Sequence, residues 1–480
     1  MKTSFLCLWL ALSWPALALD VRTFGAVGNG SQDDTQAIQN AINACPDDGT
    51  LDFGAGTYAV TGLYARSRCT YSGGGNSTLI LAAGNAFILN ISERSGIRIT
   101  GLKFNGNQLG GAIIAQGFAP ADNIHIDHCE FRNIVRSATY PANLAIVSTW
   151  GLTNSTIESN QFVSIAGGIW ITTVQNVGIL NNSFTDVTEG SAIYIAPNAV
   201  SFPSGDGLRI AGNSGSNLVG TAIEIFQPDP PNGSVLNAPV IEDNSFSNWI
   251  GSGVFGLSIT HGNGAIIRNN RLNNSTGVSQ FAAIELIAPN ARVEGNVING
   301  GFSNGVAVQG APAPSITGNT ITGMGDNGII LACDLAHGRC ASRKALISNN
   351  LITNAHHAGV KLDNDWSDSV VSRNTILRTA GFWGDDGQVL FSGIHQSPAP
   401  GTGVIDGNWI IQNSPTWPQG FWFAGIRINS SMPGSSVTNN MIGSSAVSAF
   451  GSGIIDNTGA AFLGWNIQGN SYLNVFPSLN

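Results

Sequence analysis

Acidic, basic and aromatic side chains recur at one position of a short repeated phrase, although only 10% of the residues are charged. The phrase is Gly-apolar-x-apolar, and its x residues are Trp170, Tyr194, Glu224, Phe255, Glu285, Ala307, Ile330, Lys361, His395, Arg427 and Ile455. Alternate side chains of a β-strand point to opposite faces, so the x residues point outward while their apolar neighbours point inward. We therefore expect one outward row of side chains that could act on a bound molecule.

The first cluster in this row consists of Tyr194, Glu224, Phe255 and Glu285. Strands of successive coils lie about 4.8 Å apart, which separates the backbones of Glu224 and Glu285 by roughly 10 Å. Their carboxyl groups could then reach the ~6.5–9.5 Å separation of inverting glycoside hydrolases, one as acid and one as base. We expect Phe255 between them to raise one pKa by desolvation. Two solvated glutamates on a strand are the alternative.

The second cluster consists of Lys361, Asp363, Asp365, His395 and Arg427. The loops beside it contribute Trp383, Asp385, Asp386 and Trp422. Exposed Trp near polar groups suits stacking on sugars. The basic residues suit a lyase or epimerase acting on uronates, which needs a base and a cation to stabilise the enolate. In that case Asp363 and Asp365 could hold Ca²⁺; otherwise we expect no metal or cofactor. An ion-pair network is the alternative.

A second repeated phrase predicts the elements that position the row. It reads apolar-x-x-Asn-x-apolar, and its Asn residues are Asn160, Asn182, Asn213, Asn244, Asn270, Asn296, Asn319, Asn350, Asn374, Asn408, Asn440 and Asn470. Spacings of 22 to 34 residues match one solenoid turn per repeat. Each segment is too short for a helix and alternates with period two, which indicates strands. We expect Asn to take the left-handed backbone at each corner and to form a buried hydrogen-bonded ladder. The fold is predicted to be an all-β, right-handed parallel β-helix.

The N-terminal region carries a more specific signature. It runs from Val21 through Phe24-Gly25-Ala26, Asp33-Asp34-Thr35 and an amphipathic helix to Gly49–Tyr58. This opening resembles the pectate-lyase-like β-helix superfamily, in which such a helix plugs the open end of the solenoid. The resemblance implies capping for Asp33 and Asp34 and polysaccharide chemistry as a class. It predicts a cap at about 20–60 and coils at about 97–472 within one domain, 19–480.

The second cluster also partly resembles polygalacturonase-type hydrolases in its order along the chain. Asp363 or Asp365, then Asp385-Asp386, His395 and Arg427-Ile428, echo the succession of acidic pair, His and basic strand in that family. The Asn-Thr-Asp and Gly-His-Gly motifs are missing, and Asn429 stands where the family has Lys. The resemblance therefore concerns arrangement rather than membership.

Targeting and composition restrict the partners. Residues 1–18 have Lys2, an apolar stretch and Ala16-Leu17-Ala18, which predicts a secretory signal peptide and a secreted protein. A net charge of −9 without a basic stripe disfavours nucleic acid, and no later stretch is apolar enough to span a membrane. Secretion favours disulfides Cys45–Cys69 and Cys333–Cys340, which leave Cys129 as a buried thiol.

Four functions remain open, all with a polysaccharide or oligosaccharide partner. The first is a glycoside hydrolase using Glu224 and Glu285, with Asp363, Asp385 or Asp386 and His395 as the alternative set. The second is a uronate lyase or epimerase using Lys361, His395, Arg427 and Tyr194. A fructan transferase of β-helix type would use the same carboxylates as the hydrolase. The fourth is a glycan-binding protein without catalysis.

Overall fold

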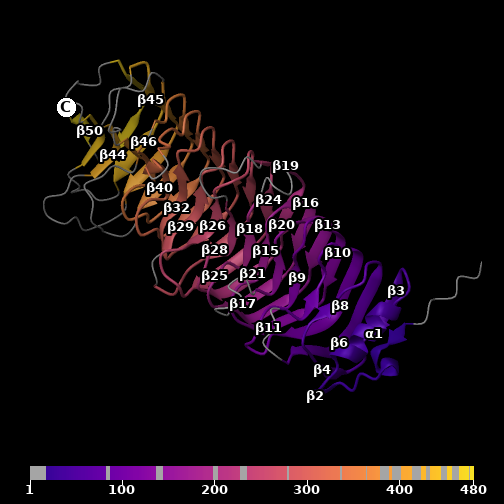
Figure 1. Ribbon diagram of the computed structural model, residues 1–480. Coiled ribbons are helices and arrows are strands. Elements are labelled where there is room, and N and C mark those ends of the chain that lie inside the picture. Colours follow the sequence, from indigo (N-terminus) through magenta and orange to yellow (C-terminus); the bar gives the residue numbers. More distant parts are fainter. Residues whose placement is uncertain are drawn as a thin grey trace, which may run out of the picture.

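The computed structural model describes residues 18–82, 87–136, 144–197, 204–226, 235–277, 280–335, 338–363, 365–378, 389–391, 402–412, 423–428, 433–444, 451–456, 464–474 and 476–479. They form a right-handed parallel β-helix, as the repeats predict. Figure 1 shows an elongated stack of coils with the helix α1 (Thr35–Ala44) at its N-terminal end. The predicted signal peptide lies outside the described residues apart from Ala18, and it stays a prediction.

Each coil contributes strands to two sheets. A typical coil consists of β30 (Arg292–Glu294), β31 (Val297–Asn299) and β32 (Phe302–Gln309). The first two strands belong to a sheet of 32 described strands, and the third belongs to a sheet of 16. The 16-stranded sheet consists of β5 (Leu63–Tyr64), β7 (Leu89–Asn90), β9 (Ile113–Ala115), β12 (Ile146–Ser148), β15 (Ile169–Ile171), β18 (Ile193–Ile195), β22 (Ile223–Ile225), β26 (Phe255–Ile259), β29 (Gln280–Leu286), β32, β35 (Ile329–Ala332), β38 (Val360–Leu362), β41 (Val389–Phe391), β44 (Phe423–Ile428), β47 (Gly451–Asp456) and β50 (Phe476–Leu479).

The asparagine ladder runs through the bend between the first two strands of the coils. Asn182 accepts hydrogen bonds at Oδ1 from both the backbone N and Nδ2 of Asn160, each at 3.0 Å, and donates to the Ile157 carbonyl at 2.9 Å. The same pattern repeats to Asn470. One expectation was wrong: the left-handed residue is the one before each ladder Asn, such as Asn181 with φ 55°. The ladder Asn must turn its amide inward, so its predecessor makes the corner.

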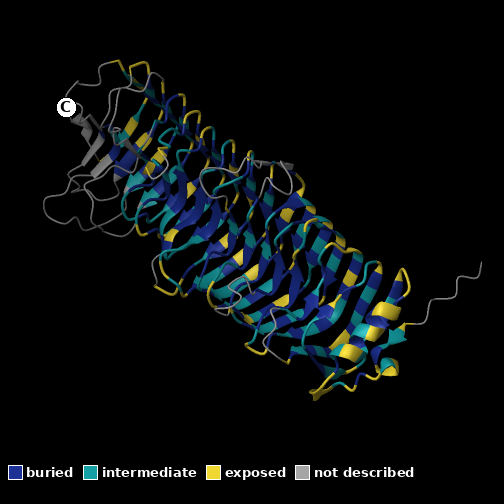
Figure 2. Cartoon of the chain, in the orientation of Figure 1, coloured by how far each residue is buried: buried dark blue, intermediate teal, exposed yellow. Residues whose placement is uncertain are grey.

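Apolar side chains stack along the inside of the coils, where the strand positions are buried (Figure 2). The rings of Phe104, Phe131, Phe162 and Phe184 lie one above another with centroids 5.1, 4.8 and 4.6 Å apart. Cys129 fills the ladder position of an early coil, where its N–H donates to Asn160 Oδ1 at 2.9 Å. It is a buried free thiol, as predicted. Repetition of one side chain per coil therefore fixes the register of the stack.

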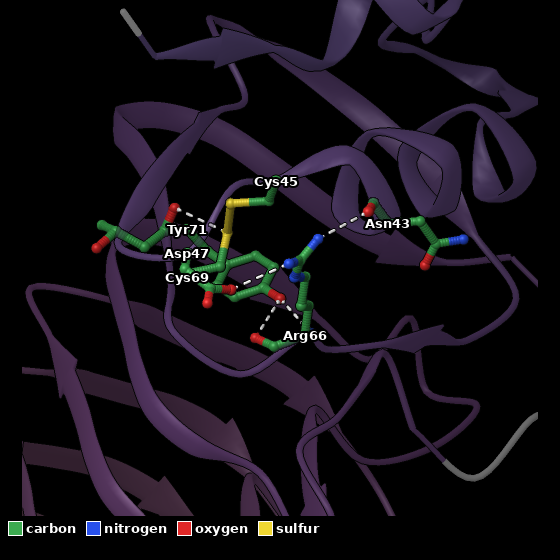
Figure 3. Close-up of a disulfide and its surroundings, with 7 residues drawn as sticks. Asn43, Cys45, Asp47, Arg66, Cys69 and Tyr71 are labelled. Carbon is green, nitrogen blue, oxygen red and sulfur yellow. Dashed lines mark hydrogen bonds and ion pairs between the residues drawn. A yellow bond between two sulfur atoms is a disulfide. The ribbon is translucent and has the colours of Figure 1, made fainter. Parts of the chain in front are cut away.

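The N-terminal cap is held by its helix and a disulfide. Cys45, directly after α1, is bonded to Cys69, and Arg66 beside it forms an ion pair with Asp47 at 3.0 Å (Figure 3). Asp34 accepts hydrogen bonds from the N–H groups of Val27 and Gly28, at 2.7 and 3.0 Å. Asp33 accepts one from Thr35 at the start of the helix. Both aspartates are therefore structural.

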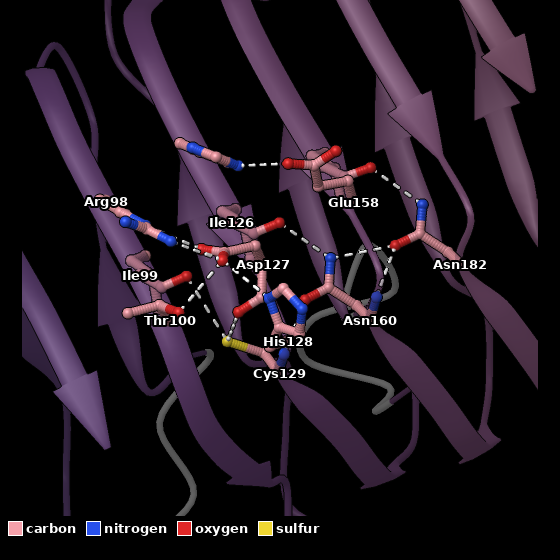
Figure 4. A network of polar contacts seen from close by, with 12 residues as sticks. Arg98, Ile99, Thr100, Ile126, Asp127, His128, Cys129, Glu158, Asn160 and Asn182 are labelled. Carbon is pink, nitrogen blue, oxygen red and sulfur yellow. Dashed lines mark hydrogen bonds and ion pairs between the residues drawn. The ribbon is translucent and has the colours of Figure 1, made fainter. Parts of the chain in front are cut away.

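A group of charged side chains on the outer surface of the large sheet forms one network of ion pairs and hydrogen bonds. Burial of Asp127 raises its pKa, but hydrogen bonds from Arg98 and His128 outweigh this and lower the pKa to about 2 (Figure 4). His125 lies 2.8 Å from Glu158 in the same network. These histidines serve as partners of buried or half-buried carboxylates.

The second predicted disulfide, Cys333–Cys340, is also present. It closes a loop that follows β35 on the 16-stranded sheet. No helix in the described part of the chain has the length and apolar composition needed to cross a bilayer.

Candidate active site

The 16-stranded sheet carries an outward row in register from coil to coil. Its residues are Tyr64, Asn90, Ile114, Val147, Trp170, Tyr194, Glu224, Ser258, Glu285, Ala307, Ile330, Lys361 and Arg427, and the backbone of Leu390 and Ile455 continues the same register. Trp170, Tyr194 and Glu224 are neighbours on successive coils, and Glu285 lies two coils beyond Glu224. The row therefore brings together the polar residues of the first predicted cluster.

The predicted position of Phe255 was wrong. Glu224 pairs with Ser258, and Phe255 pairs with Ala282. On this coil the repeated phrase is Gly256-Leu257-Ser258-Ile259. Leu257 and Ile259 are fully buried in the core, so Ser258 between them takes the outward position. Phe255 instead contacts Phe281, with ring centroids 5.7 Å apart. A hydroxyl, and not an aromatic ring, separates the two glutamates.

The predicted position of His395 in the row was also wrong. The register partner of both Lys361 and Arg427 is Leu390, in β41. The long segment between Arg378 and Val404 contains more than one stretch compatible with a strand, and pairing selects the earlier one. His395 itself lies outside the described residues.

Glu224 is half-buried at the centre of β22. The Ser191 hydroxyl donates a hydrogen bond to Oε2 at 2.5 Å. Burial raises the pKa of Glu224, and the hydrogen bond from Ser191 opposes this without cancelling it. Tyr194 lies one coil earlier, and burial together with the charge of Glu224 raises its pKa to about 12. Tyr194 is therefore a neutral hydrogen-bond donor at ordinary pH.

Glu285 is more deeply buried, with 6% exposure. The Ser258 hydroxyl donates to Oε2 at 2.5 Å, and Gln309 Nε2 donates to Oε1 at 3.0 Å. Burial is the largest cause that raises the pKa of Glu285, the negative charges of Glu224 and Asp334 add to it, and the hydrogen bonds from Ser258 and Gln309 oppose it; the resulting pKa is about 7. Asp334 belongs to the loop closed by the second disulfide. Glu224 and Glu285 thus interact electrostatically, and Glu285 takes up a proton readily.

A cavity of about 580 Å³ opens over the Trp170–Glu224 part of the row. Trp170, Tyr194, Phe226 and Glu224 all line it. The Trp170 and Tyr194 rings lie 5.8 Å apart, and those of Tyr194 and Phe226 lie 6.5 Å apart. Aromatic faces beside a carboxyl group are the usual composition of a sugar site. Glu285 is not among the lining residues.

Several residues of this cavity were not predicted. Glu189, in the loop after β17 (Ser183–Val187), lines the wall with Arg136, and the Arg136 Nε lies 3.8 Å from its carboxylate. Leu144 and Phe226 come from segments next to strands. Trp170 stood in the predicted row but was given no role. Loop residues follow no period, so the sequence does not show which way their side chains point. The one hint in the sequence was that Glu189 is acidic and stands shortly before the strand that carries Tyr194.

The second cluster is only partly assembled. Lys361 Nζ lies 3.4 Å from the Asp363 carboxylate, and Arg427 lies two coils beyond Lys361. Asp365 is paired instead with Arg343 and Ser367. Burial raises its pKa, but hydrogen bonds from Ser367 and Arg343 outweigh this and leave the pKa below its ordinary value. Asp363 and Asp365 thus have different partners.

The remaining predicted residues cannot be placed. They are Trp383, Asp385, Asp386, His395 and Trp422, all outside the described residues. Within the described ranges, no group of three or more His, Cys, Asp or Glu side chains is arranged to hold a metal ion.

One family model agrees with the fold. Residues 232–383 match the family model described as a right handed beta helix region. No curated protein matches the sequence. Among solved structures, PfbA, a surface adhesin of Streptococcus pneumoniae, is 15% identical with a TM-score of 0.49, over 78% of this chain and 92% of that chain.

Two other similar structures are enzymes by name. The A-module of the mannuronan C-5 epimerase AlgE4 of Azotobacter vinelandii is 14% identical, with a TM-score of 0.29, over 96% of this chain and 97% of that chain. The catalytic unit of a GH87 α-1,3-glucanase of Streptomyces thermodiastaticus is 15% identical, with a TM-score of 0.38, over 97% of this chain and 70% of that chain. Identities this low concern the fold alone. The chain has a right-handed parallel β-helix fold, as its repeats predict.

Proposed function

We propose that this protein is a secreted glycoside hydrolase that cleaves a neutral polysaccharide or oligosaccharide in the Glu224 cavity. The observation that carries the proposal is the position of Glu224, whose pKa is raised by burial, among three aromatic rings that line one cavity. A general acid must hold a proton near the working pH and must reach the glycosidic oxygen. Burial of Glu224 favours its protonated form, and its position in the lining of the cavity places it beside a bound sugar.

Glu189 is the proposed base. It lines the same cavity as Glu224 and keeps an exposed carboxylate, whereas Glu285 is 6% exposed and outside the lining. An inverting mechanism needs a second carboxylate with room for a water molecule between it and the sugar. In this scheme Glu224 protonates the leaving oxygen while Glu189 takes a proton from the attacking water. Glu285 is then a buried neighbour of Glu224.

Charge in the cavity favours a neutral sugar. Glu189 and Glu224 are acidic, and Arg136 is the basic residue of the lining and already faces Glu189. A uronate carboxylate would approach the negative charge of Glu189, and the described lining has no further cation to receive it, which is unfavourable in a partly dry site. The two disulfides support secretion, because such bonds persist in oxidising compartments.

A panel of neutral and acidic polysaccharides tests the proposal. New reducing ends without ultraviolet absorbance at about pH 5–6 would indicate hydrolysis, and both signals together would indicate β-elimination. Glu224→Gln and Glu189→Gln should each reduce turnover by roughly 10²–10⁴-fold. Glu285→Gln should reduce it by less than tenfold; an equal loss would move the role of base to Glu285.

The uronate lyase is the second candidate, and it is favoured by one observation. Lys361 and Arg427 lie on the same face two coils apart, so two cations could meet one acidic sugar chain. A lyase should lose activity with Lys361→Ala or Arg427→Ala and tolerate Glu224→Gln. The hydrolase should show the reverse pattern.

A further inference from the structure

The outward row is covered on the N-terminal side of the cavity. Ile114 and Val147 occupy the row in β9 and β12, yet they are only 7% and 3% exposed. Together with Leu144 and Ala166 they form a small hydrophobic cluster separate from the main core, and Phe87 packs against it. Side chains from outside the sheet therefore cover the face at these coils.

This cluster is also one wall of the cavity. Trp170 packs against the cluster and lines the cavity, and Leu144 belongs to both. A polysaccharide lying along the row would have to displace Leu144 and Phe87 from Ile114 and Val147 to continue toward the N-terminal coils. Exposing these apolar side chains to water again is unfavourable in proportion to the surface exposed. A glycan bound along the row therefore ends at this wall.

The opposite side of the cavity has an exposed aromatic ring. Val254 lines the cavity, and its carbonyl accepts a hydrogen bond from the Phe281 N–H at 3.0 Å. The Phe281 ring is paired with Phe255 and remains 57% exposed. An exposed ring held at the rim by a second ring offers a flat surface for one more sugar unit.

We propose that the cavity binds the terminal unit of a neutral glycan and that the rest of the glycan leaves across Phe281, so that hydrolysis proceeds from one chain end. Internal cleavage needs room for the chain on both sides of the acid. Among the described residues of the row, the covered part leaves room on one side only. This inference rests on the proposed function, since it assigns the mode of action of the same site.

Binding to the inactive Glu224→Gln variant tests the inference without turnover. The probes are neutral hexasaccharides from dextran, laminarin, inulin and xylan, each unlabelled or carrying a bulky fluorophore at the reducing or the non-reducing end. For the hexasaccharide that binds, we expect a label at one end to weaken binding at least tenfold. A label at the other end should change the affinity by less than threefold.

Two further variants, each made in the Glu224→Gln background, separate chain-end binding from general surface affinity. Phe281→Ala should weaken hexasaccharide binding by about 2–10-fold, the range for loss of one aromatic contact, and leave binding of the corresponding monosaccharide unchanged. Phe118→Ala is the matched control: its ring is 87% exposed beside Trp150, away from the cavity lining, and its loss should change neither affinity.

The outcomes separate chain-end binding from the proposed hydrolysis. Equal binding of both end-labelled forms would overturn chain-end recognition and leave the hydrolase standing. Unaltered hexasaccharide affinity in Phe281→Ala would overturn the proposed exit path. Failure of every probe to bind would overturn the cavity as a neutral sugar site, and with it the proposed function.

Discussion

Replacement of Glu285 by Gln should remove a pH dependence of stability from this fold. Gln has nearly the same shape and remains neutral at every pH, while Glu285 becomes a buried anion as the pH rises. Its pKa is raised by burial first, and then by Glu224 and Asp334, from 4.5 to about 7. The folded state therefore binds the Glu285 proton over a pH range in which the unfolded chain has released it.

The sign and size of the effect follow from this difference. A raised pKa in the folded state contributes stability that is fully present below about pH 4.5 and lost as the pH rises through about 7. Each pH unit between the two pKa values corresponds to about 1.4 kcal/mol, so the loss approaches about 3 kcal/mol. Glu285→Gln should avoid it and be more stable than the wild type at pH 8 by an amount of this order.

Urea unfolding followed by tryptophan fluorescence at pH 4.5, 6 and 8 measures the effect. The wild-type free energy of unfolding should fall with pH, and the fall should be much smaller in Glu285→Gln. Glu294→Gln is a matched control, because Glu294 is only half-buried and its carboxylate faces Arg292 at 3.4 Å; it should keep the wild-type fall. A fall of equal size in Glu285→Gln and wild type would refute the reasoning.

Two further predictions concern the stack itself. Asn270→Ala leaves the buried Asn244 N–H and the Ile241 carbonyl without their partners, and each unpaired group costs about 1–3 kcal/mol of stability. The control Asn273→Ala, on the outer face, should cost less than about 0.5 kcal/mol. Denaturant midpoints of the two variants measure the difference. Phe162→Ala should cost about 3–5 kcal/mol because its ring is fully buried between two others, whereas Phe162→Leu should cost clearly less; equal losses for both would contradict a packing origin.

The fold could be predicted from the sequence because one turn of the solenoid repeats its constraints. A ladder position must satisfy the backbone of its neighbours, so Asn recurs there, and Cys129 takes its place in an early coil. Both disulfides were predicted from the expected secretion and from the positions of the cysteines, and one closes the cap while the other closes a loop. The left-handed residue was assigned one position too late, since both the corner and the ladder favour Asn.

The site was predictable only where it belongs to the repeat. Tyr194, Glu224 and Glu285 are strand positions, and the row places them together. Phe255 was misplaced because its coil contains two overlapping Gly-apolar phrases, and strand pairing alone decides between them. Glu189 comes from a loop, where no period links sequence position to the direction of a side chain.

The central claim is that Glu224 donates the proton in a sugar-binding cavity. Turnover and binding of the same neutral oligosaccharide, measured side by side for the wild type and Glu224→Gln, test it most directly. We predict a loss of turnover of roughly 10²–10⁴-fold with an affinity that changes only a few-fold, because Gln keeps the shape of the site and loses the acid. Retained turnover in Glu224→Gln would contradict the claim.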